Sequence, residues 1–402
     1  SFIRPEYNIL DSSNPESVEK LLEVASTSPY VSIDLETDGN EKNDGLYYHK
    51  GFIVGIGILF TQFTRYIGFY IPIAHRIPKP KGQIGLSLPL TSDIFFDNWV
   101  YGSDIKQFSL QEAFDILGKV IKDKTVIGHN IKFDYKFLVY NGFEEISKNE
   151  LFDTCLAGYC LANSYTVGKE MLKQLGLKVL IRKYLNIPEI KVFKDFKNKL
   201  SETPIIEVAE YCINDCYFSY YLYEKFSEQF LRSPSLSRLF NVVELPLIKI
   251  LADMEMDGVK INVKYLDELD KIIDSSLLSK TEEIKKLIGK PINLNSPIQI
   301  KKLLYDDFKL PPIKKLVKRK KTETNKRGRI EILAVDSDAL DKLIADCKNE
   351  KICYILRGIK EITYLQHIYS TYISGYKEKI IEDRIYTDYL QFGSRSGRIK
   401  SS

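Results

Sequence analysis

The stretch YVSIDLET, residues 30–37, decides the fold of this chain. β-branched and aromatic residues alternate along it, and two acids lie near its end. Two runs of the same kind follow, GFIVGIGILF at 51–60 and RYIGFYIPI at 65–73, with turn-rich, charged residues between them. Such runs are typical of strands, so we expect all three to be neighbours in one sheet.

Helical patterns come after these strands. Ser109-Leu-Gln-Glu112 is a capping box and predicts a helix to about Lys122. TVIGHN at 125–130 predicts another strand, whereas 74–108 lacks periodicity and predicts a loop or insertion. Apolar residues at helical spacing predict further helices at 132–140, 153–162, 168–176 and 205–230. Strands followed by interleaved helices indicate a mixed α/β domain.

The length of 402 residues suits two domains, and Ser233-Pro234-Ser235 ends the first long helical pattern. We therefore expect one domain over residues 1–235 and a second, mostly helical, over 236–402. The second part has 32 Lys and Arg against 24 Asp and Glu, a net charge of +8, while the first has a net charge of −4. This asymmetry favours a polyanion partner, with nucleic acid as the first candidate.

The composition excludes several classes of protein. With 44% hydrophobic and 28% charged residues the chain is globular rather than disordered, and no apolar run is long enough to span a membrane. None of the six cysteines forms a Cys-x-x-Cys pair, so we expect free thiols in a reducing compartment, the cytoplasm, or the host cytoplasm if the protein is viral. The four histidines do not have zinc-site spacing, and a metal here would need oxygen ligands.

Carboxylates form the strongest chemical signal. Asp34 and Glu36 are one residue apart on a strand and share a face. Asp134 follows the strand-to-helix turn that begins at Asn130-Ile-Lys-Phe, and Tyr211 and Asp215 are four residues apart on a helix. Each signal alone has a plainer interpretation: a solvated strand end, a helix N-terminus and a core tyrosine, respectively.

The combination of four acids and one tyrosine in this order matches a two-metal phosphodiester hydrolase, in which two Mg²⁺ ions lie about 4 Å apart. In this interpretation Asp34 bridges both ions, Glu36 and Asp215 bind the first, and Asp134 binds the second. Tyr211 then orients the attacking water, and Mn²⁺ can substitute for Mg²⁺.

These residues resemble the three motifs of the DEDDy 3′-to-5′ proofreading exonucleases, and the wider sequence resembles family A DNA polymerases of the bacterial DNA polymerase I class. The resemblance covers nearly the whole chain. It implies a ribonuclease-H-like α/β exonuclease domain followed by the mostly α-helical thumb and the first part of the palm. Supporting stretches are YIPIAH at 70–75, FDTCLAGYCL at 152–161, VELPLIKILADMEMDGVKIN at 243–262, INLNSPIQIKKLL at 292–304 and RIYTDYLQFGSRSGRIKSS at 384–402.

A basic segment at 312–331 holds nine Lys and Arg against two Glu and predicts a mobile loop. By resemblance it is the tip of the thumb, which grips duplex DNA through its phosphates; the plainer alternative is a solvated loop. The resemblance also implies that Arg398 faces the primer-template duplex. The residues expected to bind DNA are Asn130, Lys318, Arg319, Lys320, Lys321, Arg327, Arg329 and Arg398.

The sequence stops at Ser402, before the palm and fingers motifs that carry the metal ligands of the polymerase. We expect a separate or removed C-terminal polypeptide to carry them, and the strand-like run at 384–392 to pair with its strands. The predicted function is a Mg²⁺-dependent 3′-to-5′ exonuclease acting on single-stranded or frayed DNA ends. Two alternatives stay open: a non-catalytic DNA-binding subunit of a split polymerase, and a standalone RNA-trimming exonuclease.

Overall fold

A computed structural model describes residues 5–41, 43–76, 99–100, 103–162, 173–185, 199–318, 329–392 and 397–401. The chain forms two compact units. The first comprises Ser1–Asp257 together with Thr387–Ser402, and the second is Gly258–Tyr386. Residues 236–257, which were expected to begin the second domain, therefore pack with the first unit. The predicted functional division at residue 235 stays a prediction.

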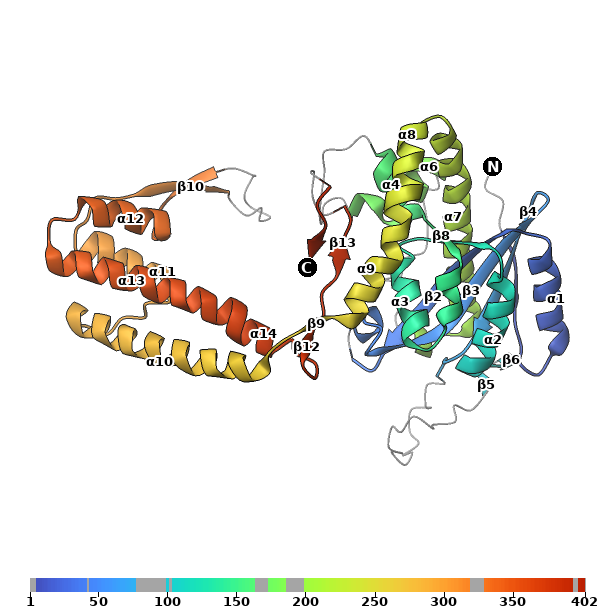
Figure 1. Cartoon of the computed structure of the whole chain (residues 1–402), viewed down its shortest axis with the longest axis horizontal. Coiled ribbons are helices and arrows are strands. Elements are labelled where there is room, and N and C mark those ends of the chain that lie inside the picture. The colour runs from blue at the N-terminus through green and yellow to red at the C-terminus, as the bar shows by residue number, and fades with distance from the viewer. Residues whose placement is uncertain are drawn as a thin grey trace, which may run out of the picture. The chain divides into compact units, whose positions relative to one another are not determined.

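A sheet of six strands forms the centre of the first unit (Figure 1). The three strand-like runs at 30–37, 51–60 and 65–73 are neighbours in it, as predicted. The central strand β2 pairs antiparallel with β3 and parallel with β7. In sheet order the strands are β1 (Glu6–Ile9), β4 (Arg65–Pro72), β3 (Gly51–Gln62), β2 (Tyr30–Gly39), β7 (Thr125–Gly128) and β8 (Glu150–Asp153).

Helices cover both faces of this sheet (Figure 1). The long helix α7 (Ile205–Leu231) crosses one face, and α1 (Pro15–Ser26), α2 (Leu110–Ile121) and α3 (Lys132–Tyr140) lie on the other. The predicted capping box of α2 is present: the Ser109 hydroxyl accepts from Glu112 N, and a Glu112 carboxylate oxygen accepts from Ser109 N at 2.8 Å.

Two shorter helices, α4 (Thr154–Leu161) and α6 (Leu177–Leu185), complete this part of the first unit. α4 coincides with the helix expected at 153–162. Of the helix expected at 168–176, residues 168–172 lie outside the described residues.

Gly57 on β3 allows α7 to approach the sheet closely. A Cβ at this position would lie 2.5 Å from Cys212 Sγ and 2.9 Å from Cys216 Sγ, closer than real side-chain contacts permit. Gly57 is directly opposite Asp34 in the pairing of β2 with β3. The glycine therefore places α7 against the face of β2 that carries Asp34.

A buried ionic network joins α3 to later parts of the first unit. After α8 (Pro234–Leu239) and a π-helical segment (Phe240–Glu244), helix α9 (Leu245–Asp257) brings in Glu255, which is 2% exposed. One Glu255 oxygen pairs with Lys132, and the other lies 2.6 Å from Lys136 Nζ. Tyr389 N also donates to Glu255. This network anchors α9 and the segment around Tyr389 to α3.

The run at 384–392 does not form the single strand that was expected, and its expected pairing with strands of another polypeptide stays a prediction. β12 (Arg384–Ile385) pairs with β9 (Val259–Lys260), and β13 (Tyr389–Leu390) pairs with β14 (Lys400–Ser401). The run is split because Glu255 holds Tyr389 N, and Phe392 is buried.

The second unit is mostly helical, as predicted. A core that includes Ile284, Leu304 and Leu356 holds its helices together. Gly358 on α13 allows close contact with Ile284 on α10, because a Cβ there would lie 2.2 Å from Ile284 Cδ1. The helices are α10 (Val263–Ile288), α11 (Pro297–Lys301), α12 (Ser337–Asp346), α13 (Glu350–Ile368) and α14 (Gly375–Lys377), with π-helical segments at Lys302–Asp307 and Tyr369–Ser374.

The basic segment at 312–331 is not wholly a loop. β10 (Lys314–Lys318) and β11 (Arg329–Leu333) pair antiparallel at its two ends. Apolar residues alternate with charged ones in RIEIL, which favours a strand. Residues 319–328 lie outside the described residues. Within the described residues, no helix is long and apolar enough to cross a membrane.

Candidate functional site

Asp34 and Glu36 lie on the face of β2 that packs against α7. Cys212 of α7 joins them, and one ligand atom from each of the three lies within 4.8 Å of the others. Glu36 is 5% exposed and Asp34 is half-buried. The register of β2 with β3 shifts between Glu36 and Thr37, and such bulges often re-aim side chains beside active sites.

Asp134 reaches the same strand from α3. Its side chain is buried, and Oδ1 accepts a hydrogen bond of 3.0 Å from the backbone N–H of Leu35, the residue between Asp34 and Glu36. The structure therefore brings three of the four predicted acids together around β2.

The turn before Asp134 is shaped by Asp153, a residue that the sequence analysis did not select. The Asp153 carboxylate accepts from the backbone N–H groups of Asn130 at 3.1 Å, Ile131 at 3.0 Å and Cys155 at 2.7 Å. Asn130 has φ 60°, a left-handed conformation that asparagine tolerates, and its side chain is exposed. The position of Asp153 at the N-cap of α4 was the signal that sequence reasoning could have used.

Tyr211 and Asp215 lie on α7, and Asp215 is 7% exposed. The Asp215 carboxylate forms an ion pair with Lys178 of α6, a residue that sequence reasoning missed. Lys178 Nζ lies 4.8 Å from the centre of the Tyr211 ring. No local pattern in the sequence could have placed Lys178 among these acids.

Burial makes the charged forms of these acids costly. It raises the pKa of Asp34 to about 6, although the nearby Lys178 ammonium acts in the opposite direction. The pKa values of Glu36 and Asp134 are raised well above the ordinary range, first by burial and then by the charge of Asp34. The cluster therefore favours a neighbouring positive charge.

The donor atoms fit a hard divalent cation. The acids offer carboxylate oxygens, which Mg²⁺ and Mn²⁺ prefer, and Glu36 Oε1 is a buried oxygen without a hydrogen-bond partner among the described residues. Cys212 Sγ lies 3.4 Å from the Asp34 carbonyl oxygen and donates to it. Burial raises the pKa of Cys212 well above its usual range, so it stays a thiol rather than a thiolate ligand.

Except for Asn130, the expected DNA-binding residues lie far from this cluster in the sequence. Lys318 ends β10 and Arg329 begins β11. Arg398 lies just before β14 and is exposed. The remaining members of the expected basic set, Arg319, Lys320, Lys321 and Arg327, lie outside the described residues.

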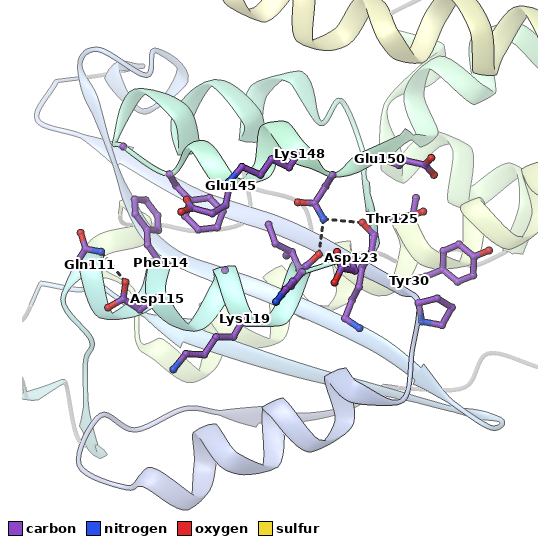
Figure 2. Close-up of a pocket in the computed structure, with 18 residues that line it drawn as sticks. Tyr30, Gln111, Phe114, Asp115, Lys119, Asp123, Thr125, Glu145, Lys148 and Glu150 are labelled. Atoms are coloured by element: carbon purple, nitrogen blue, oxygen red, sulfur yellow. Dashed lines mark hydrogen bonds between the residues drawn. The ribbon is translucent and has the colours of Figure 1, made fainter.

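A surface pocket lies at the other end of the parallel strands (Figure 2). It is lined by Tyr30, Thr125 and Glu150, which begin β2, β7 and β8. Figure 2 shows charges of both signs around it, with Gln111 hydrogen-bonded to Asp115 over 2.9 Å. In α/β sheets ligands bind at the carboxyl ends of strands, which favours the acidic cluster over this pocket as the functional site.

Comparisons with known proteins cover both units. Residues 94–230 match a family model described as 3′-5′ exonuclease, and residues 263–402 match the model for DNA polymerase family A. Asn130, Asp134, Tyr211 and Asp215 fall within the first match. Asp34 and Glu36 precede this match in the sequence. Asp134 contacts the strand that carries them, through its hydrogen bond from Leu35 N.

DNA polymerase I of Synechocystis sp. (strain ATCC 27184 / PCC 6803 / Kazusa) is 29% identical over 96% of this chain and 34% of its own length. DNA polymerase I of Borreliella burgdorferi is 27% identical over 96% of this chain and 36% of its own length. The chain thus spans about a third of the length of these relatives.

Among solved structures, the POL domain of Pol1 from M. smegmatis, in complex with DNA primer-template and dNTP, covers 98% of this chain and 54% of that chain, with a TM-score of 0.64 and 20% identity. This likeness supports the fold: a mixed α/β unit followed by a mostly helical one. The chain is thus similar over nearly its whole length to bacterial DNA polymerase I, and it matches the 3′-5′ exonuclease model and, after it, the model for DNA polymerase family A.

Proposed function

We propose that this chain is a metal-dependent 3′-to-5′ exodeoxyribonuclease, the proofreading part of a family A DNA polymerase. It removes nucleotides from single-stranded or frayed 3′ ends and releases nucleoside 5′-monophosphates. The metal ions are Mg²⁺, for which Mn²⁺ substitutes.

The observation that carries this proposal is the gathering of carboxylates around β2. Asp34 and Glu36 come from β2 and Asp134 from α3, and Asp215 of α7 is linked to them through Lys178, which pairs with Asp215 and also acts on the charge of Asp34. The 3.0 Å hydrogen bond from Leu35 N to Asp134 supports the grouping, because it fixes the α3 acid beside the two β2 acids. Burying several acids in one place is costly unless a cation offsets their charge.

Each residue has a role in the proposed reaction. Asp34, Glu36, Asp134 and Asp215 would hold the divalent cations. When bound, such ions activate water and stabilise the charge that develops on the phosphate. The Tyr211 hydroxyl orients the attacking water, and Asn130, exposed beside Asp134, contacts the DNA strand.

The thumb region supplies a second DNA contact in this proposal. The hairpin of β10 and β11 joins a segment rich in Lys and Arg, of which Lys318, Arg319, Lys320, Lys321, Arg327 and Arg329 are the expected phosphate contacts. Arg398 is proposed to contact the same duplex. Contacts of this kind give affinity without sequence preference and make binding depend strongly on salt.

The substrate experiment uses 5′-labelled single strands of DNA and RNA of the same sequence, with Mg²⁺ or with a chelator. The proposal expects a ladder of DNA products that shorten from the 3′ end, mononucleotide release, and no products with the chelator. Faster degradation of RNA would favour the alternative of an RNA-trimming exonuclease. No degradation of either strand would favour the non-catalytic DNA-binding subunit.

A polypeptide that carries palm and fingers stays an expected partner. Mixing it with this chain and measuring templated primer extension tests that expectation. Extension by the mixture supports the partnership, and a mixture no more active than the added polypeptide alone contradicts it.

A further inference from the structure

Lys178 places a positive charge inside the acidic cluster. It is the second residue of α6, and its side chain is only 15% exposed. Nζ forms an ion pair with Asp215, whose side chain is 10% exposed. The ammonium also lies 4.8 Å from the centre of the Tyr211 ring and 5.3 Å from that of Phe218. Two aromatic rings and a carboxylate therefore surround this charge.

Two other lysines close to Asp134 are engaged elsewhere. Lys132 and Lys136 flank Asp134 on α3, but both pair with Glu255. Lys178 instead pairs directly with Asp215, one of the proposed metal ligands. Its ammonium offsets part of the negative charge that the buried acids bring together.

A divalent ion and the ammonium compete at Asp215. Lys178 pairs with Oδ1 of this carboxylate, and a divalent ion on either carboxylate oxygen would lie close enough to the ammonium to repel it strongly in a partly buried site. An ion that binds Asp215 must therefore displace Lys178 from its ion pair.

We propose that Lys178 is an internal counter-ion, which occupies the cation position at Asp215 in the metal-free protein and leaves it when a divalent ion binds. This inference rests on the proposed function, because it takes Asp215 as a metal ligand. In both states a cation therefore offsets part of the negative charge of the acidic cluster. It also weakens metal binding, since the ion pair must first be broken.

The test measures Mn²⁺ binding without DNA, by calorimetry, on the full chain and on Lys178→Gln. Removing the competing charge is expected to tighten the Mn²⁺ site at least tenfold. Lys183→Gln is the matched control: Lys183 lies on the same helix but is exposed, over the ring of Tyr184, and Mn²⁺ affinity should stay within twofold. The metal-free melting temperature of Lys178→Gln should fall, and its rise on adding Mn²⁺ should exceed that of the parent chain.

A lower melting temperature with unchanged Mn²⁺ affinity would overturn the inference and leave Lys178 a structural partner of Asp215. If Lys178→Gln does not fold, Lys178→Arg provides the test instead. This variant keeps the positive charge, so it should bind Mn²⁺ no more tightly than the parent chain. Tighter binding would contradict the inference. A different result would count against the proposed function itself: the parent chain and Asp34→Ala would bind Mn²⁺ with the same affinity.

Discussion

Asp134 accepts a hydrogen bond of 3.0 Å from the backbone N–H of Leu35, 99 residues earlier in the chain. Leu35 separates the two acids of β2, so this bond fixes the α3 acid relative to both of them. It gives Asp134 two separable functions: its oxygen accepts a structural hydrogen bond, and its charge serves the proposed metal site.

Two substitutions at Asp134 should separate these functions. Asp134→Asn keeps an oxygen that accepts from Leu35 N, whereas Asp134→Ala leaves this buried N–H without its partner, at a cost of about 1–3 kcal/mol. We expect Asp134→Ala to be less stable to urea than Asp134→Asn, and both to lose exonuclease activity more than 100-fold. Equal stability of the two variants would show that the hydrogen bond contributes little.

Tyr211→Phe should reduce the rate less than loss of a carboxylate does. The substitution removes only the hydroxyl proposed to orient water, and the ring still lies beside Lys178. We expect a loss of about 10-fold in single-turnover hydrolysis, well below the 100-fold expected for the acids. A loss as large as that of an acid would assign Tyr211 a more direct role.

Neutralising the thumb segment should weaken duplex binding and reduce its salt dependence. If Arg319, Lys320, Lys321 and Arg327 all contact phosphates, replacing them with Gln lowers the slope of log affinity against log salt by about 3 to 4. Hydrolysis of a short single strand should hardly change. Replacing Lys119 and Lys122, which line the pocket of Figure 2, is the control and should leave the slope unaltered. An unchanged slope in the thumb variant would mean that the segment is merely solvated.

His75 should make the fold sensitive to mild acid. It is 2% exposed, Nε2 lies 2.9 Å from the Tyr70 hydroxyl, and burial lowers its pKa from 6.5 to about 4. Between pH 6.5 and about pH 4 the unfolded chain binds more protons than the folded chain, so the free energy of unfolding falls as the pH falls. From pH 7 to pH 5 the parent should lose about 2 kcal/mol of unfolding free energy relative to His75→Gln. Unfolding free energies from urea titrations that change equally with pH in the two chains would contradict this prediction.

Local periodicity predicted much of the first unit. In YVSIDLET, Ile33 and Leu35 are buried in the core, while Asp34 and Glu36 face α7, which is the alternation that the sequence indicated. The capping box at Ser109 and the strand followed by a helix around Asn130 were predictable for the same reason: each signal lies within a few residues.

Contacts between distant segments could not be predicted in this way. The pairing of Lys178 with Asp215 and of Lys136 with Glu255 depends on which helices pack together, and no local spacing encodes it. The split of the run at 384–392 has the same origin, because a buried carboxylate from α9 holds Tyr389 N. Residues 312–331 were expected to be a loop because of their charge, although the alternation of apolar and charged residues in RIEIL, at the end of the segment, favoured a strand.

The most direct test of metal-dependent exonuclease activity compares Asp34→Ala and Asp215→Ala with the parent chain on a 5′-labelled single strand of DNA, in Mg²⁺ and in Mn²⁺. Asp115→Ala, an exposed acid at the opposite end of the sheet strands, is the control. We predict folded variants with hydrolysis reduced more than 100-fold for the two cluster acids, a loss of about 3 kcal/mol or more in transition-state stabilisation, and unchanged hydrolysis for Asp115→Ala. Hydrolysis at the parent rate by Asp34→Ala or Asp215→Ala would contradict the assignment of the metal site.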